Sequence, residues 1–307
     1  MSRKVFVLLL AIFVILSSAA AALAQVSKDE VVYAALQADG GVKEIYVVNI
    51  YESDETSQVT DYAAYARALP LGRADDFSYE DGKAAFTLNP GRFSYQGDLE
   101  SKALPWQISI SYTLDGQEAE PLSLSGASGK MEGKIKIAVN PEFSALAEAL
   151  ALQVSVTLDG DKCLNIVSDK ATFAYAAGNL ALSYVVLPGQ EAEYTFSFDA
   201  RDFSMSAIQI AGVRMAMDQD MYKEMAAKAM AGTPFESSVG NLMSGFLNAM
   251  QGRPVASFTD SRNQVRAVQF VMMTEEIPEK PAEKPQPEAE TGKDANFLMR
   301  LGKLLGL

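Results

Sequence analysis

The chain has 307 residues, about half of them apolar, with 26 basic and 39 acidic side chains, one cysteine and no histidine. The absence of histidine excludes Ser-His-Asp and Cys-His catalysis and His-ligated zinc or iron sites, and a single cysteine excludes a disulfide within the chain. A net charge of −13 disfavours nucleic-acid binding, and the apolar content allows hydrophobic cores without covalent cross-links.

The N-terminus has the organisation of a secretory signal peptide. Two basic residues precede an apolar run over residues 5–16, and small residues end in an Ala-x-Ala site at 22–24. We expect residues 1–24 to be cleaved, which leaves 24 basic and 39 acidic side chains and a net charge near −15. An uncleaved anchor is the alternative, because residues 5–24 are just long enough to span a bilayer.

The first part of the mature chain reads as a small β-rich domain over residues 27–102. Apolar runs at 31–38 and 42–51 flank Asp39-Gly40-Gly41, which predicts a hairpin. The second run is apolar on both faces, so we expect its strand to be covered on both sides. Beyond it, the spacing of three apolar side chains predicts a short helix that ends at a proline: Tyr62, Tyr65, Leu69 and Pro70. Short strands follow at turn signals, at 77–79, 84–88 and 93–95.

A second β domain is expected over residues 103–275. Trp106 leads into an alternating strand over 107–113 that ends at a turn, and we expect its large ring to anchor the core. A short helix after Asn140 and Pro141 should bury three apolar side chains, Phe143, Leu146 and Leu150. Turn dipeptides separate the further strands of a sandwich, at 134–139, 152–158, 180–187, 193–199 and 208–213.

The period of the apolar pattern changes to that of a helix between residues 218 and 251. Two helices, 218–231 and 234–250, should form a helical hairpin, and strands at 255–259 and 265–271 should then rejoin the sheet of the Trp106 domain. Methionine-rich surfaces adapt to different partners, so four side chains of the hairpin are candidates for a partner surface: Met221, Met225, Phe246 and Met250. The alternative is that these side chains pack the helices on each other and on the sheet.

The C-terminus combines a spacer with an amphipathic segment. Residues 276–293 are rich in Glu, Lys and Pro, which is typical of an extended spacer, and residues 294–307 predict a helix. Its apolar arc and the opposite basic positions fit a membrane surface or a partner groove: Phe297, Leu298, Leu301, Leu304 and Leu305, with Arg300 and Lys303. A frayed tail, or one docked back on the body, is the alternative.

No motif in the sequence identifies a catalytic, cofactor or metal site, and we expect none. The segment 126–130 resembles a phosphate loop but lacks its first glycine and the Ser or Thr after the lysine. Asp39, Asp159 and Asp161 could contribute to a calcium site, but turn chemistry explains them better. Cys163 is expected to be a small buried apolar side chain, with an intermolecular disulfide as the alternative.

Several short motifs together resemble one protein family. They comprise 42–49, Tyr95-Gln-Gly-Asp98, Leu104-Pro-Trp106, 124–130, 152–159, Asp161-Lys-Cys163, Val186-Leu-Pro-Gly189 and 268–271. The chain is similar to uncharacterised exported cell-envelope proteins of Firmicutes, whose members often carry Leu-x-x-Gly repeat arrays where this chain has residues 218–251. The resemblance covers most of the mature chain and implies export, but it supplies no activity.

The sequence therefore predicts a mainly β protein with two β-sandwich-like domains, a helical hairpin excursion, a Pro-rich spacer and a C-terminal amphipathic helix. The leading functional hypothesis is a non-enzymatic exported binding or assembly protein, extracellular or associated with the cell envelope and tethered through its C-terminal helix. Its expected partners are an envelope protein or a membrane surface, and the helical hairpin offers a route to oligomerisation. The alternative is an extracellular carboxylate-based, carbohydrate-active enzyme, which would need two facing carboxylates about 5–10 Å apart in a deep pocket.

Overall fold

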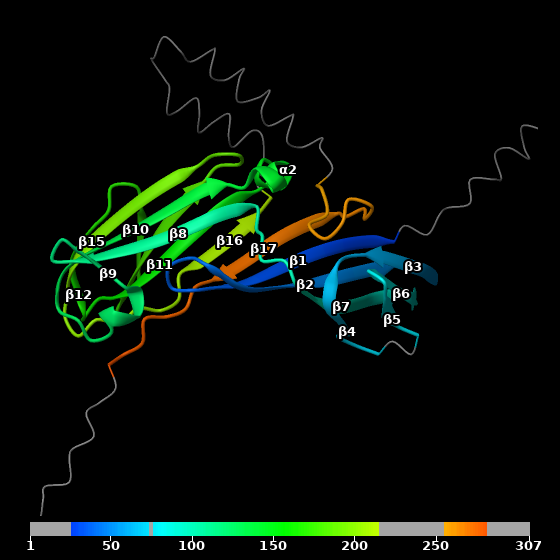
Figure 1. Cartoon of the computed structure of the whole chain (residues 1–307), viewed down its shortest axis with the longest axis horizontal. Coiled ribbons are helices and arrows are strands. Elements are labelled where there is room, and N and C mark those ends of the chain that lie inside the picture. Colours follow the sequence, from blue (N-terminus) through cyan, green and yellow to red (C-terminus); the bar gives the residue numbers. More distant parts are fainter. Residues whose placement is uncertain (1–25, 74–75, 215–254, 281–307) are drawn as a thin grey trace, which may run out of the picture.

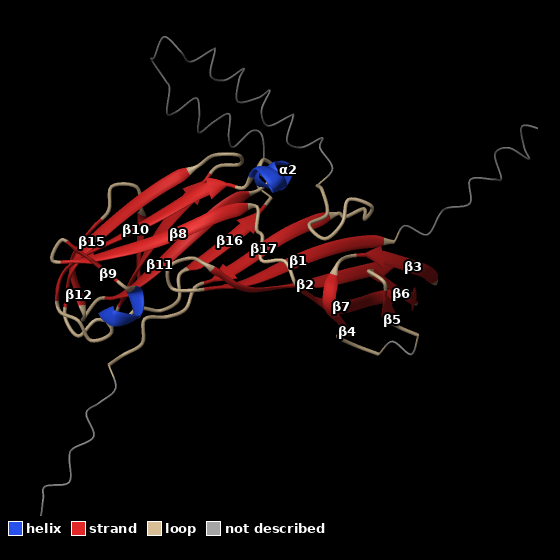
Figure 2. Ribbon diagram, viewed as in Figure 1, coloured by secondary structure: helices blue, strands red, loops and turns tan. Residues whose placement is uncertain are grey.

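The computed structural model describes residues 26–73, 76–214 and 255–280, and within them the protein is mainly β, as predicted (Figures 1 and 2). The signal segment 1–24, the helical hairpin 218–251, most of the spacer 276–293 and the tail 294–307 lie outside the described residues. The helical elements that are described are short, namely η1 (Pro121–Leu124), η2 (Pro141–Phe143) and α2 (Ser144–Ala147). None of the helices in these ranges is long and apolar enough to cross a membrane.

A nine-stranded sheet runs the length of the molecule (Figure 1). Its order is β13 (Thr172–Ala176), β14 (Asn179–Val186), β11 (Ala151–Asp159), β16 (Gln209–Val213), β17 (Ala267–Met273), β1 (Ser27–Leu36), β2 (Val42–Ser53), β7 (Gly91–Leu99) and β4 (Tyr65–Pro70). The strand β17 joins the two halves, because it pairs in parallel with β1 and antiparallel with β16.

Two smaller sheets complete the fold. One has the order β12 (Cys163–Val167), β15 (Ala192–Ala200), β10 (Gly129–Val139), β8 (Trp106–Leu114) and β9 (Gln117–Ala119). The other has the order β3 (Ser57–Tyr62), β6 (Lys83–Leu88) and β5 (Ser78–Glu80). The predicted boundary between residues 102 and 103 falls between β7 and β8. All strands of the three-stranded sheet precede this boundary, and all strands of the five-stranded sheet follow it.

Both small sheets pack on the same face of the nine-stranded sheet. Trp106 on β8 packs edge-on against Phe270 on β17, with ring centroids 5.2 Å apart, and Tyr51 on β2 packs against Phe86 on β6 at 5.1 Å. The register places Phe270 opposite Val32 of β1, and the same face continues to Tyr51 of β2. The buried side chains from all three sheets form one continuous core.

Trp106 is a core anchor, as predicted, because only 3% of the residue is exposed. The short helix after Asn140 is also confirmed, and the Asn140 side chain caps it by accepting a hydrogen bond from the Glu142 amide. Leu146 and Leu150 of this region are buried. The predicted return of the chain is confirmed for β17, while residues 255–259 contribute only an isolated bridge between Ala256 and Gln264.

The predicted helix between residues 53 and 73 is wrong. This region forms β3 and β4, and Tyr65 begins β4 with its ring packed over Gly97 of β7, where an added Cβ would lie 2.4 Å from the ring. Its hydroxyl accepts a hydrogen bond from the buried Asn49 amide at 2.8 Å. A spacing of three and four residues resembled a helical face, but pairing with distant strands determines the local structure.

The expectation that the 42–51 strand is covered on both sides is met on one side only within the described residues. Val47 and Tyr51 are buried in the core, whereas Tyr46, Val48 and Ile50 point away from the small sheets and are half-buried. The ring of Tyr46 stacks on Tyr33 of β1, with centroids 4.9 Å apart. The outer face of the long sheet therefore carries apolar side chains on β1 and β2, although both small sheets lie on the other face.

Candidate functional site

A buried charged cluster joins the nine-stranded sheet to the three-stranded sheet. Lys28 and Glu30 are two residues apart on β1, so both side chains point to the core-facing side, and Asp61 is on β3. The Lys28 ammonium lies 2.8 Å from Glu30 and 2.7 Å from Asp61, and all three residues are almost fully buried. A buried charge is tolerated only when it is paired and hydrogen-bonded, so each member depends on the others.

The same cluster holds residues 257–259, which follow the predicted helical excursion. Glu30 accepts hydrogen bonds from the Ser257 hydroxyl at 2.6 Å, the Phe258 amide at 2.7 Å and the Thr259 hydroxyl at 2.9 Å. Asp61 accepts from the Tyr95 hydroxyl and from the Tyr62 amide. Donors therefore surround both carboxylates, and the cluster fixes three distant segments together.

The cluster acts as a noncovalent structural link between the segments that it joins. Lys28 forms an ion pair with both carboxylates, other donors occupy their oxygens, and all three residues are buried, so neither carboxylate is accessible to a substrate. Burial raises the pKa of the Tyr95 hydroxyl far above its ordinary value, and the Asp61 charge raises it further. Tyr51 beside it follows the same rule, with burial first and Asp61 second. These tyrosines remain neutral donors over the whole physiological range.

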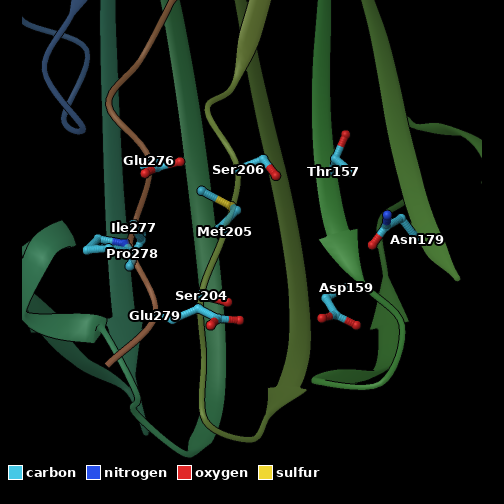
Figure 3. A pocket seen from close by; sticks show the side chains of 10 residues that line it. All are labelled: Thr157, Asp159, Asn179, Ser204, Met205, Ser206, Glu276, Ile277, Pro278 and Glu279. Atoms are coloured by element: carbon cyan, nitrogen blue, oxygen red, sulfur yellow. The ribbon is translucent and has the colours of Figure 1, made fainter. Parts of the chain in front are cut away.

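A pocket of about 310 Å³ opens between the β11–β14 region and the C-terminal described segment (Figure 3). Thr157, Asp159 and Asn179 lie on one side, and Glu276, Ile277 and Glu279 lie on the other, with residues 204–206 between them (Figure 3). The Lys162 ammonium lies 2.7 Å from Glu279 and 3.0 Å from the Ser204 hydroxyl. One carboxylate of the pocket is therefore engaged in an ion pair.

The C-terminal described segment is fixed to the body. Ile277 exchanges two main-chain hydrogen bonds of 2.9 Å with Met205, and its side chain is buried. The Glu275 amide donates to the Leu36 carbonyl at 3.0 Å. The first residues of the predicted spacer are thus part of the folded body up to Lys280, the last described residue of this segment.

The aspartates considered for calcium serve as turn residues. An Asp159 side-chain oxygen accepts a hydrogen bond from the Asp161 amide at 2.9 Å, and Asp39 does the same for Gly41 at 2.9 Å. Among the described residues, no group of three or more acidic or cysteine side chains is arranged to hold a metal ion. Cys163 is buried, as predicted, and burial raises the pKa of its thiol to about 12.

The strand β13 is an exposed edge of the nine-stranded sheet. All five of its residues are exposed, including Phe173 at 45% and Tyr175 at 74%. Their partners on β14 are Leu182 and Leu180, which are buried, so both rings lie on the core-facing side of the sheet. Both rings are exposed because the five-stranded sheet does not cover them. An uncovered edge with apolar side chains is a template for an added strand.

The other sheet edges in the described part of the chain each carry a feature that opposes strand addition. Arg67 and Pro70 lie on β4, and β9 and β5 have three residues each. The β12 edge is irregular, with Asn165 at a positive φ of 52°. At the β3 edge, Asn263 accepts from the Tyr62 amide at 3.0 Å and donates to its carbonyl at 2.7 Å. The β13 edge has neither charge, proline nor bulge within it.

The side chains predicted from sequence as contact residues all lie outside the described residues. They are Met221, Met225, Phe246 and Met250 of the predicted helical excursion, and Phe297, Leu298, Arg300, Leu301, Lys303, Leu304 and Leu305 of the predicted tail. Sequence analysis missed β13. Its only local signal is Thr172-Phe-Ala-Tyr-Ala176 followed by a glycine at 178, which is too short to stand out from a loop.

Comparisons with known proteins identify distant structural similarity only. No family model and no curated protein matches the sequence. The Fcho1 mu homology domain from Danio rerio with a bound Eps15 peptide is 12% identical, with a TM-score of 0.40 over 81% of this chain and 94% of that one. The yeast delta-COP-I mu-homology domain is 10% identical, with a TM-score of 0.37 over 81% and 95%. At these TM-scores the similarity establishes no shared function.

Proposed function

We propose that this chain is an exported, non-enzymatic binding or assembly protein of the cell envelope. It pairs with a protein partner through the edge of β13 and is tethered through residues 294–307. The observation that carries the proposal is the exposed β13 edge, with two aromatic side chains and none of the features that oppose strand addition elsewhere.

The last described residues before the predicted tail lie close to this edge. The Gly160 amide donates to the Gly178 carbonyl at 3.0 Å, so the turn of the β13–β14 hairpin touches the turn after β11. Lys162 of the latter turn binds Glu279 at 2.7 Å, one residue before Lys280, the last described residue of this segment. These contacts link the β13 hairpin to the last described residues before the predicted tail, which supports a tether on this side of the body.

The alternative, a carboxylate-based enzyme, has less support in the described residues. Glu30 and Asp61 form the buried carboxylate pair, and Lys28 occupies the space between them. In the pocket of Figure 3, Glu279 is paired with Lys162 and Asp159 accepts a turn hydrogen bond. The buried pair leaves no space for the water that glycoside hydrolysis requires, and in the pocket the ion pair of Glu279 leaves Asp159 and Glu276 as the remaining carboxylates.

Retention of the mature protein on isolated envelopes tests the proposal in two arms. The first compares the full mature chain with a chain that ends at Thr291, and we expect the shorter chain to be released. The second compares Tyr175→Pro with Tyr175→Ala. Proline removes an edge N–H, whereas alanine removes only the ring, so main-chain pairing predicts that proline causes the greater loss of partner binding.

Two results would contradict the proposal. Equal retention of the full and shortened chains would remove the tether. Equal partner binding by Tyr175→Pro and the wild type, with unchanged thermal stability in both, would show that the β13 edge is not the binding element.

A further inference from the structure

The hairpin turn determines which main-chain groups of β13 face outward. Ala177 and Gly178 have φ values of 49° and 83°, as a two-residue type I′ turn requires. In such a hairpin the residues flanking the turn, Ala176 and Asn179, form a hydrogen-bonded pair, and hydrogen-bonded pairs then alternate along the strands. The N–H and C=O groups of Phe173 and Tyr175 therefore point away from β14.

These outward groups have no main-chain partner within the described part of the chain. They are two donors and two acceptors at the end of a sheet, spaced two residues apart. Two exposed aromatic rings belong to the same residues. The surface offers strand pairing and apolar burial together.

The β13 sequence is complementary to itself in an antiparallel register centred on Ala174. In that register Phe173 faces Tyr175 of a second strand, and each such pair exchanges two main-chain hydrogen bonds because both residues present their groups outward. The two-fold axis gives two such pairs and hence four hydrogen bonds. Ala174 faces its own copy in the close, non-hydrogen-bonded position, where a small side chain fits, and Thr172 faces Ala176.

We propose that the partner of β13 is a second copy of this chain, paired antiparallel about Ala174 in an isologous dimer. This rests on the proposed function and names its partner. The two copies extend one sheet across the interface and place Phe173 against Tyr175 on the core-facing side, as a cross-strand aromatic pair. Because both copies carry a large negative charge, added salt should strengthen the dimer by screening their repulsion.

A disulfide trap tests the register directly in the full mature protein. Cα atoms in a non-hydrogen-bonded antiparallel pair lie about 4.5 Å apart, within reach of a disulfide. We expect Ala174→Cys to cross-link two copies under mild oxidation. Ala176→Cys is the matched control, since in this register it faces Thr172 of the second copy and should not cross-link. The native Cys163 is buried and should not contribute.

A charge test addresses the same contact without oxidation. Ala174→Lys places two ammonium groups opposite each other across the two-fold axis, whereas Ala176→Lys adds the same charge opposite a neutral threonine. By sedimentation velocity, we expect Ala174→Lys to weaken dimerisation by about tenfold and Ala176→Lys to weaken it much less.

A wild-type chain that remains monomeric across its soluble concentration range would overturn the inference, as would equal cross-linking of Ala174→Cys and Ala176→Cys. The outcome is separable from that of the proposed function. A monomeric chain that still loses envelope partner binding on Tyr175→Pro would refute the second copy and leave strand addition by another protein in place.

Discussion

Removing the cation of the buried cluster should be far more damaging than removing a surface cation. Lys28 is 4% exposed and contacts Glu30 and Asp61 at 2.8 and 2.7 Å. Lys28→Met keeps most of the volume but leaves two buried carboxylates without a counter-charge. Breaking a buried pair in this way costs about 3–5 kcal/mol. For a body of this size, that corresponds to a fall in Tm of roughly 6–20 °C.

The matched control is Lys43→Met, which removes an equally short ion pair to Glu275, at 2.7 Å, with both partners substantially exposed. An exposed pair contributes little to stability, because solvent and salt screen it. The assay is thermal unfolding followed by circular dichroism at low and high salt, and salt should affect the Lys43 pair more than the Lys28 cluster. Similar Tm values for Lys28→Met and Lys43→Met would refute the view that the cluster is a structural cross-link.

Three further predictions follow from particular contacts. Trp106→Ala should reduce the free energy of unfolding by about 3–5 kcal/mol in chemical denaturation, because the ring packs on Phe270; a loss equal to that of a surface variant would contradict the packing. The hydrogen bonds from Arg262 lower the pKa of Asp260 to about 2. The stabilising contribution of Asp260 is therefore present above the ordinary aspartate pKa and is lost as pH falls toward 2. NMR titration should show the pKa of Asp260 rising in Arg262→Gln, and an unchanged pKa would show that Arg262 does not lower it. The mature protein should sediment reversibly with anionic vesicles, less so in high salt and not at all when Leu301 and Leu304 are changed to Asp; equal sedimentation of a chain ending at Thr291 would show that the tail is not a membrane element.

Local turn chemistry made much of the fold predictable. The β1–β2 hairpin follows from Asp39-Gly40-Gly41, and Gly40 is required there because its φ is 92° and an added Cβ would lie 2.7 Å from the Ile108 carbonyl oxygen. The position of β8 was likewise predictable, because the alternation of apolar and polar residues after Trp106 and the turn that ends it are local signals. The β1 strand begins earlier than expected, because Lys28 and Glu30 are polar residues on a buried face.

Long-range pairing was the part that the sequence could not reveal. The parallel contact between β1 and β17 joins residues more than 230 positions apart, and no local pattern encodes it. The buried cluster was missed for a related reason, since Lys28 and Asp61 read as solvent-exposed charges until β3 is placed against β1. The candidate binding edge was missed because β13 is short, and because the exposure of its side chains depends on how far the five-stranded sheet extends over the nine-stranded one.

Amide hydrogen exchange at Phe173 and Tyr175 tests the central claim most directly. In the dilute mature protein, both amides should exchange rapidly, because they face away from β14, whereas Ala174 between them should be protected by its hairpin partner. A rise in the concentration of the mature protein, or the addition of native envelope material, should slow exchange at Phe173 and Tyr175 and leave the Arg67 amide on the opposite edge unchanged. Exchange at Phe173 and Tyr175 that stays equally rapid at low and high protein concentration, with and without envelope, would contradict the claim that β13 is the binding edge.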